Sequence, residues 1–432
     1  MLNLELIARA EGRLKEAFER IDAIALVNQM RVLSAFKEHK LTEEFFAEHT
    51  GYGIDDAGRE AMDRIFATVF GCQAAAVRMQ MVSGTHAIAC ALFGNLGPGD
   101  RLVSLTGRPY DTLEEVIGIK EAAASATTGG ASAETNAKKT GSLFSLGVSY
   151  VELDLDPQRQ SEATIIEAIK AVGPANLYHI QKSRGYSMVR RTLSNQDIGR
   201  LCTLLRQVYP QARVFVDNCY GEFVEDAEPT AHGANLIAGS LIKNPGGGLA
   251  LTGAYVAGDS DMVEAALIRL TAPGIGGHLG VTFNQNRLVF QGLFLAPSVV
   301  AGAVKGAMLA AEVMAELGFK IDPAPLEQRF DIIQAIEFGD RQKLINFCRA
   351  IQSFSPVNAH VCPEPSGMPG YADQVIMAGG SFVEGATIEL SCDGPLREPF
   401  AAYLQGGLSY LHVKSALLGA LNLSESGEAR FF

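Results

Sequence analysis

The sequence predicts an α/β protein in which a large domain with a mainly parallel, doubly wound sheet is followed by a smaller α+β domain. Between residues 79 and 242, short apolar runs typical of strands alternate with helical patterns of about a dozen residues. This order favours parallel strands joined by helices. The length agrees, because 432 residues, of which 47% are apolar, exceed what one compact core usually holds.

The first 58 residues are predicted to form a helical arm and a loop. Apolar positions such as Leu4, Ile7, Leu14 and Phe18 follow the helical period, with charged residues between them. The segment GYGIDDAGRE, residues 51–60, interrupts this pattern with glycine and aspartate. We therefore expect a loop at this place that leads into the next helix.

Residues 59–297 are predicted to form the large domain. Its expected strands are residues 79–84, 100–107, 148–155, 175–181, 212–218 and 236–242. Its expected helices are residues 85–96, 112–123, 161–172 and 195–207. Ligands of such sheets bind beyond the carboxyl ends of the strands. We also expect a mobile loop at residues 125–142 that covers an active site, and a linker or substrate loop at residues 271–280.

Residues 298–432 are predicted to form a bridging helix and the small C-terminal domain. The bridging helix is expected from about residue 298 to 317, where alanine is frequent. Antiparallel strands are expected at residues 331–338, 373–382 and 387–394, and a closing helix at residues 406–421.

Composition excludes several classes of protein. A net charge of −12 would repel a phosphodiester backbone, so we expect no nucleic-acid partner. The seven cysteines form no C-x-x-C pair and no Cys/His cluster with zinc spacing, which predicts no metal site and reduced thiols in a cytoplasmic protein. The N-terminal segment lacks a signal-peptide core, and no run of 18 uncharged apolar residues predicts a membrane span.

Asp217 and Lys243 carry the strongest functional signal. Asp217 ends the apolar run VFV, and Lys243 follows 26 residues later on a turn that contains three successive glycines. Pyridoxal phosphate (PLP) requires such a pair, because a lysine forms a Schiff base with its aldehyde and a carboxylate keeps its ring nitrogen protonated. The alternatives are a surface lysine on an ordinary turn and a turn aspartate, which is common after strands.

Five further residues are candidates for the cofactor site. Ser83, Gly84 and Thr85 open a helix after a strand, where free backbone N–H groups and the helix dipole attract a phosphate; an ordinary helix cap is the alternative. Ser240, three residues before the lysine, is suited to bond a phosphate oxygen. Tyr110 follows the next strand and is placed to stack on the ring and move protons, or else is a partly buried turn tyrosine.

Two arginines are candidates for binding the substrate. Arg397 follows a strand of the small domain, and an amino-acid substrate needs a guanidinium for its carboxylate. The alternative is a helix-start arginine paired with a glutamate. Arg184 belongs to a polar cluster after another strand, together with His179, Lys182 and Tyr186, and this position indicates the rim of the site.

Taken together, these residues resemble the fold-type I PLP enzymes, and within them the cystathionine/methionine γ-lyase-like group that includes the "aluminium resistance" proteins. The resemblance covers nearly the whole chain, through segments such as SGTHAI, IQKSRGYS, VDNCYGEF, GSLIKNPGGG and GPLREPFAAYLQGGLSYLHVK. It departs from the γ-lyases at the lysine, where they carry SxTK, and at the stacking tyrosine, where YGGT is replaced by PYDT.

The resemblance implies roles for individual residues. It implies PLP on Lys243, Asp217 at the ring nitrogen and Tyr110 over the ring, with Gly84, Thr85 and Ser240 around the phosphate. It also implies a homo-oligomer, a dimer or tetramer with shared active sites. In that assembly Tyr52 of the GYG motif enters the phosphate site of the neighbouring subunit, so residues 1–58 include an oligomer contact.

The expected reaction is the elimination of a thiol from a sulfur-containing amino acid at its β or γ carbon, leaving a keto acid and ammonia. In this scheme the amine of Lys243, its pKa lowered by the site, removes the α-proton, and Tyr110 protonates the leaving group. Another PLP reaction, such as γ-replacement or aldol cleavage, would require the same residues. The alternatives outside catalysis are a PLP-binding stress protein with little turnover and a nucleotide-binding module without PLP.

Overall fold

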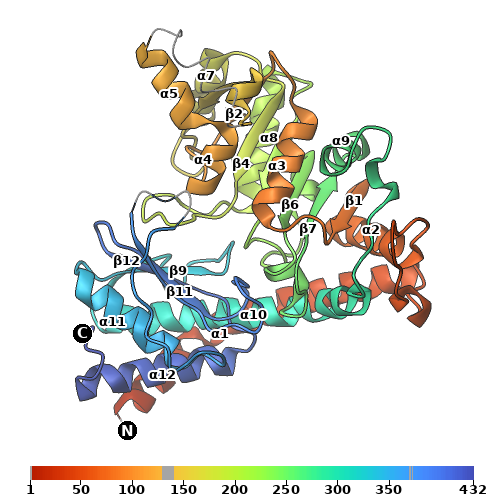
Figure 1. Cartoon of the computed structure of the whole chain (residues 1–432). Helices are drawn as coiled ribbons and strands as arrows, with labels where there is room; N and C mark the ends of the chain where they lie inside the picture. The colour runs from red at the N-terminus through yellow and green to blue at the C-terminus, as the bar shows by residue number, and fades with distance from the viewer. Residues whose placement is uncertain (1, 129–140, 369–370, 372) are drawn as a thin grey trace.

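A computed structural model of the chain describes residues 2–128, 141–368, 371 and 373–432. It contains one seven-stranded and one five-stranded sheet, with two long helices running beneath both (Figure 1). The predicted covering loop at residues 125–142 lies largely outside the described residues, and residues 125–128 belong to a helix. The predicted fold class is therefore present.

The large sheet is mixed, with strand order β1-β7-β6-β5-β4-β2-β3. Every neighbouring pair is parallel except the two made by β7, which runs antiparallel to β1 and β6. The strands are β1 (Ala74–Arg78), β2 (Arg101–Ser104), β3 (Ser149–Glu152), β4 (Leu177–Gln181), β5 (Val214–Asp217), β6 (Leu236–Ser240) and β7 (Ala254–Gly258).

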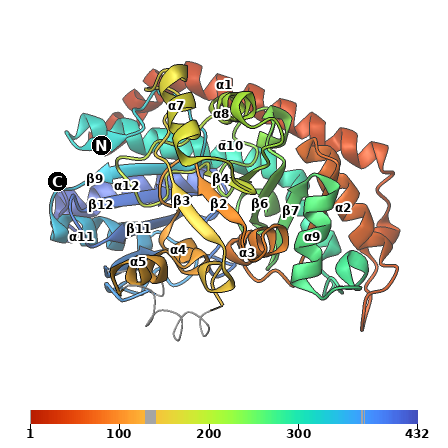
Figure 2. The ribbon, with the colours of Figure 1, turned by 90° about the horizontal axis from the view of Figure 1, so that it is seen from above.

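Helices cover both faces of this sheet, as a doubly wound fold requires (Figures 1 and 2). The buried side chains of α3 and α9 form one apolar core with one face, and those of α2 and α8 join a second core on the other. The helices around the sheet are α2 (Ala57–Phe70), α3 (Gly84–Asn95), α4 (Asp111–Ile117), α5 (Ile119–Thr128), α7 (Glu162–Val172), α8 (Asn195–Val208) and α9 (Ser260–Leu270).

The small sheet is wholly antiparallel, in the order β10-β11-β12-β9-β8. Helices α11 (Arg341–Gln352) and α12 (Tyr410–Ser426) belong to this part of the chain. Its strands are β8 (Lys320–Asp322), β9 (Ile333–Glu337), β10 (Val375–Ala378), β11 (Ser391–Pro395) and β12 (Ala401–Gln405). Earlier in the chain, the described residues include the 3-10 turns η1 (Glu43–Phe46), η2 (Phe144–Leu146), η3 (Pro229–His232), η4 (Asn244–Gly246) and η5 (Gly276–His278).

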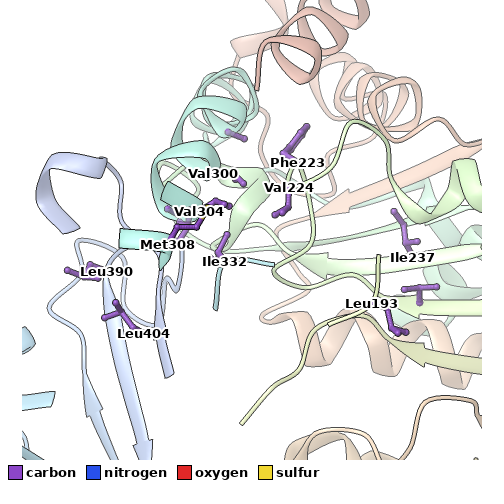
Figure 3. Close-up of a cluster of buried hydrophobic side chains, with 14 of the residues drawn as sticks. Leu193, Phe223, Val224, Ile237, Val300, Val304, Met308, Ile332, Leu390 and Leu404 are labelled. Atoms are coloured by element: carbon purple, nitrogen blue, oxygen red, sulfur yellow. The ribbon is translucent and has the colours of Figure 1, made fainter. Parts of the chain in front are cut away.

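The long helices α1 (Leu2–Glu38) and α10 (Asn286–Glu316) lie side by side along the molecule (Figures 1 and 2). Apolar side chains of α10, including Val300, Val304 and Met308, are buried in the core between the two sheets (Figure 3). By length and composition α10 would suffice to cross a membrane, but 67% of its most apolar window is buried inside the protein. We therefore describe it as a core helix.

Three predicted elements differ from those observed. The first strand is β1 at Ala74–Arg78, not residues 79–84, which form a turn and the start of α3. The helix expected at 112–123 is broken into α4 and α5 at Gly118, whose φ of 85° a side chain rarely adopts. The bridging helix begins at Asn286 rather than 298, so the predicted domain boundary at residue 297 falls inside one continuous helix.

Candidate functional site

The candidate site lies at the carboxyl ends of three adjacent parallel strands. Asp217 ends β5 and pairs in register with Gln181, which ends β4. Ser240 ends β6, the neighbour of β5 on the other side. Because parallel strands end at one edge of the sheet, the three polar side chains come together there, where ligands of doubly wound sheets bind.

Asp217 is a buried carboxylate, with 4% of its surface exposed. Its Oδ1 accepts a hydrogen bond of 3.1 Å from the backbone N–H of Cys219. Burial raises the pKa of Asp217, and the nearby cation of Lys243 partly opposes that shift. The chain therefore holds an acidic group at the sheet edge in a position where water stabilises its charge poorly.

Lys243 follows β6 and precedes the 3-10 turn η4, in which Asn244 and the next two residues are buried. Its Nζ lies 3.8 Å from the centroid of the Tyr220 ring. Burial lowers the pKa of Lys243, but the acidic groups of Cys219, Tyr220 and Asp217 raise it more, so the pKa lies above its ordinary value. The predicted lowering concerns the amine after substrate has displaced it from the cofactor, and it stays a prediction.

The start of α3 packs directly against the end of β6. Ser83 is the N-cap, and its Oγ accepts a hydrogen bond from the backbone of His86. A Cβ on Gly84 would lie 3.2 Å from Cys219 Sγ and 3.3 Å from Ser240 Cβ, so glycine allows this close approach. The backbone N–H groups of Gly84 and Thr85 have no partner among the described residues, which leaves a helix N-terminus suited to an anion.

Tyr110 links this helix start to the end of β4. Its hydroxyl lies 2.8 Å from Thr85 Oγ1, and its backbone N–H donates to Gln181 Oε1 at 2.9 Å. Burial is the first cause that raises the pKa of Tyr110, and the carboxylate of Asp217 adds to it. The phenol is therefore protonated at neutral pH and available as a hydrogen-bond donor close to Asp217 and Lys243.

The two candidate substrate arginines have different surroundings. Arg397 is 44% exposed and donates to the backbone oxygen of Tyr186 at 3.1 Å, with Asp373 Oδ2 at 3.5 Å. Arg184 is almost fully buried, and its guanidinium is held by the side chain and carbonyl of Asp322 and by the carbonyl of Arg190. Only Arg397 thus presents a partly free guanidinium here.

Other members of the polar cluster predicted at the rim lie in the interior. Lys182 is fully buried and is bound by Asn195 and Glu225. His179 is 1% exposed, and burial lowers its pKa to about 3. The rim assignment is wrong for these two residues, because both side chains are buried inside the protein.

Tyr52 lies apart from these residues. Its side chain is 73% exposed. Its backbone oxygen accepts a hydrogen bond from Gly280 at 2.9 Å, and among the described residues its side chain contacts none of the site residues. Its implied role at a neighbouring subunit therefore stays a prediction.

Sequence reasoning missed several residues of the site. Gln181, Cys219 and Tyr220 lie within motifs that already contained predicted residues, and their closeness to Asp217 and Lys243 was the available signal. Asp393 and Tyr371 come from the last quarter of the chain and reach the region through the small domain. No local pattern marks these two residues.

The fold is that of the fold-type I PLP-dependent enzymes. The model of the family described as methionine gamma-lyase matches residues 3–424, and the chain belongs to that family. A solved structure from Clostridium novyi NT, described as a carbon-sulfur lyase involved in aluminum resistance, is 44% identical, with a TM-score of 0.88 over 97% of this chain and 95% of that one.

Two further proteins are similar to this chain. The uncharacterized protein YnbB of Bacillus subtilis is 46% identical over 94% of this chain and 92% of its own length. A structure described as apo CalE6, a methionine gamma lyase from Micromonospora echinospora, is 18% identical, with a TM-score of 0.53 over 84% of this chain and 86% of that one. At that identity the likeness shows the fold alone.

Proposed function

We propose that this chain is a PLP-dependent carbon–sulfur lyase that eliminates a thiol from a sulfur-containing amino acid, leaving a keto acid and ammonia. The observation that carries the proposal is the shared sheet edge, where the buried carboxylate of Asp217 lies near the amine of Lys243. Names within the family and among its structural relatives, methionine gamma-lyase and carbon-sulfur lyase, support this reaction class.

The residues of the edge fit PLP. A lysine amine is required for its aldehyde, and Lys243 supplies one. The ring nitrogen requires an acidic group beside it. Asp217 is such a group, and it is buried away from bulk water. A phosphate requires hydrogen-bond donors, and the free N–H groups at the start of α3 lie against Ser240 through the gap that Gly84 leaves.

In the proposed reaction each group of the chain has one task. When bound, PLP withdraws electrons from the α-carbon of the amino acid. Asp217 holds a proton at the ring nitrogen, and Lys243 attaches the cofactor and then moves the α-proton. Tyr110, protonated at neutral pH and oriented by Thr85, donates a proton to the leaving sulfur. Arg397 binds the α-carboxylate.

The raised pKa of the Lys243 amine constrains this scheme. An ammonium does not attack an aldehyde and does not accept a proton. The cofactor and substrate therefore have to change the balance of charge around Lys243 before it acts as a base. Asp217, Cys219 and Tyr220 are the groups whose charge or position sets that balance.

The proposal is tested by whether PLP attaches covalently to Lys243. Purified protein should absorb visible light, and borohydride should fix the ligand on Lys243, as shown by peptide mapping. Lys182, buried but bound by Glu225, is the internal control and should stay unmodified. Release of pyruvate or 2-oxobutyrate from thioether amino acids then tests the lyase reaction. An adduct on another lysine, or no adduct, would contradict the cofactor assignment.

We also propose that the enzyme is cytoplasmic and forms a homo-oligomer in which Tyr52 reaches the neighbouring subunit. All seven cysteines are described and are free thiols, which supports a reducing compartment. Large apolar side chains stand exposed near Tyr52 in the sequence and at the start of α3, namely Ile54 and Val82. Tyr52→Ala should weaken PLP retention in the assembled protein, measured by dialysis; unchanged retention would contradict the shared site.

A further inference from the structure

The small sheet carries a buried carboxylate close to the candidate site. Asp393 lies in β11 and is 3% exposed. Its Oδ2 accepts two hydrogen bonds from neutral donors, the Tyr186 hydroxyl at 2.7 Å and Gln405 Nε2 at 3.0 Å. Its other oxygen, Oδ1, has no hydrogen-bond partner among the described residues and remains partly accessible to solvent.

Aromatic rings connect this carboxylate to Lys243. Tyr186 packs against Tyr403, with ring centroids 5.2 Å apart, and against Tyr371 at 5.8 Å. Tyr186, Tyr403 and Tyr220 belong to one apolar cluster, and the Lys243 amine lies over the Tyr220 ring. Lys243 and Asp393 therefore both contact members of the same group of tyrosines, Lys243 through Tyr220 and Asp393 through Tyr186.

The charge of Asp393 is not matched by a cation of the protein. No described lysine, arginine or histidine lies within 4.0 Å of its oxygens. Burial raises the pKa of this carboxyl to about 6, so it is mostly ionised at neutral pH. A buried charge without a partner costs stability, and such groups are often retained because they bind a ligand. The faces of the surrounding tyrosines also favour a cation.

We infer that Asp393 binds a cationic group at the far end of the substrate. The substrates that fit this arrangement are thioether amino acids whose sulfur substituent carries an ammonium, in contrast to a substituent that ends in a methyl group. The inference rests on the proposed function, because it assumes that an amino acid binds between Lys243 and the rim. Arg397 then holds the α-carboxylate, and Asp393 holds the opposite end.

Two nearly isosteric compounds test this inference. S-(2-aminoethyl)-L-cysteine ends in an ammonium, and S-propyl-L-cysteine ends in a methyl group. Binding of each to the PLP-loaded protein is followed by the change in cofactor absorption, and turnover by pyruvate release. A charge-assisted hydrogen bond predicts about ten- to a hundredfold tighter binding of the aminoethyl compound. Equal affinities in the unmodified protein would overturn the inference.

Variants assign the preference to one side chain. Asp393→Asn should remove the preference and leave binding of the propyl compound unchanged. Asp331→Asn is the matched control, because Asp331 is also buried, at 2% exposure, and accepts hydrogen bonds from two hydroxyls, those of Ser183 and Thr192. It should keep the preference. Tyr186→Phe should keep it as well, because the carboxylate remains.

The outcomes separate this inference from the proposed function. The absorption change reports binding and does not require elimination. A preference that depends on Asp393, without release of any keto acid, would support the binding site and contradict the lyase reaction. Pyruvate release from both compounds, bound with equal affinity, would support the lyase reaction and contradict the binding site. Loss of the preference in Tyr186→Phe, together with its retention in Asp393→Asn, would overturn the role of the carboxylate.

Discussion

The amine of Lys243 lies over the ring of Tyr220, with Nζ 3.8 Å from the ring centroid. Tyr220 reaches this place through a left-handed backbone conformation, with a φ of 73°. Such a conformation is costly for a tyrosine. Asp217 is the last residue of β5, and Tyr220 follows three residues later. One short turn therefore supplies both the acid and the aromatic ring next to the amine.

Replacing this ring should change how readily the amine reacts. A cation–π contact stabilises the ammonium by about 0.5–2 kcal/mol, so Tyr220→Leu should lower the pKa of Lys243 by about one unit. Only the neutral amine attacks an aldehyde. The rate at which the PLP-free protein captures PLP should therefore rise at lower pH in the variant than in the original protein. Tyr220→Phe keeps the ring but lacks the acidic hydroxyl, so its profile should lie between those of the original protein and Tyr220→Leu.

Asp217→Asn should preserve the fold and lose most activity. The two side chains have nearly the same shape, and the amide does not carry the charge that burial disfavours. An amide cannot hold a proton at the ring nitrogen, so keto-acid release should fall by at least about tenfold. Unfolding by denaturant should show unchanged or higher stability in the variant. Full activity would mean that the carboxylate is structural.

Tyr110→Phe should slow elimination in proportion to how poor the leaving group is. A positioned proton donor contributes about a hundred- to ten-thousandfold, and the loss should be greatest for alkyl thiols, which need protonation most. Aryl thiols should be affected least. Thr85→Val removes the group 2.8 Å from the hydroxyl and should show the same trend more weakly. An equal loss for every leaving thiol would point to ring stacking rather than proton donation.

Arg397 is the test of the carboxylate site. Its guanidinium group is partly exposed to solvent. Loss of one charge-assisted contact to the substrate carboxylate should weaken substrate capture about ten- to a hundredfold. Arg397→Lys should recover part of the loss, because it keeps the charge without the planar fork. The matched control is Arg191→Ala, since Arg191 is similarly exposed but pairs with Glu327. Unchanged kcat/KM in Arg397→Ala would place the carboxylate elsewhere.

The sequence predicts the strand ends of the large domain well, because apolar periodicity and glycine mark them locally. Asp217 and Ser240 both end strands as expected. It misplaces the start of α10, because Pro297 resembles a residue of a first helical turn but lies within the helix. The apolar residues after Arg78 resemble a strand, although the chain already turns there.

Contacts between distant parts of the chain could not be predicted. Tyr186 and Asp393 are 207 residues apart, and Arg184 and Asp322 are 138 apart. Neither contact leaves a local pattern, since each depends on how the small sheet packs on the large one. For the same reason the sequence suggests Arg184 for the substrate and gives no indication of Asp393.

The last prediction concerns stability and pH. Burial raises the pKa of Asp393 to about 6 from an ordinary value of 3.8. Ionisation is therefore less favourable in the folded than in the unfolded chain. The stability that is fully present below the unfolded pKa is lost as the pH rises through 6. The two-unit difference corresponds to about 3 kcal/mol at most.

Asp393→Asn cannot ionise and should escape this loss. Its free energy of unfolding, relative to the original protein, should rise between pH 4 and pH 7.5 and then stay level. Burial also raises the pKa of Glu222, to about 8, but Glu222 is present in both proteins, so its effect cancels in the difference. Denaturant unfolding without added amino acid measures the two curves, and Asp331→Asn provides the control. Parallel curves for Asp393→Asn and the original protein would show that Asp393 carries no unpaired charge. An ammonium-bearing substrate analogue should stabilise the original protein more than the variant at pH 7.5, because the ligand then supplies the missing cation.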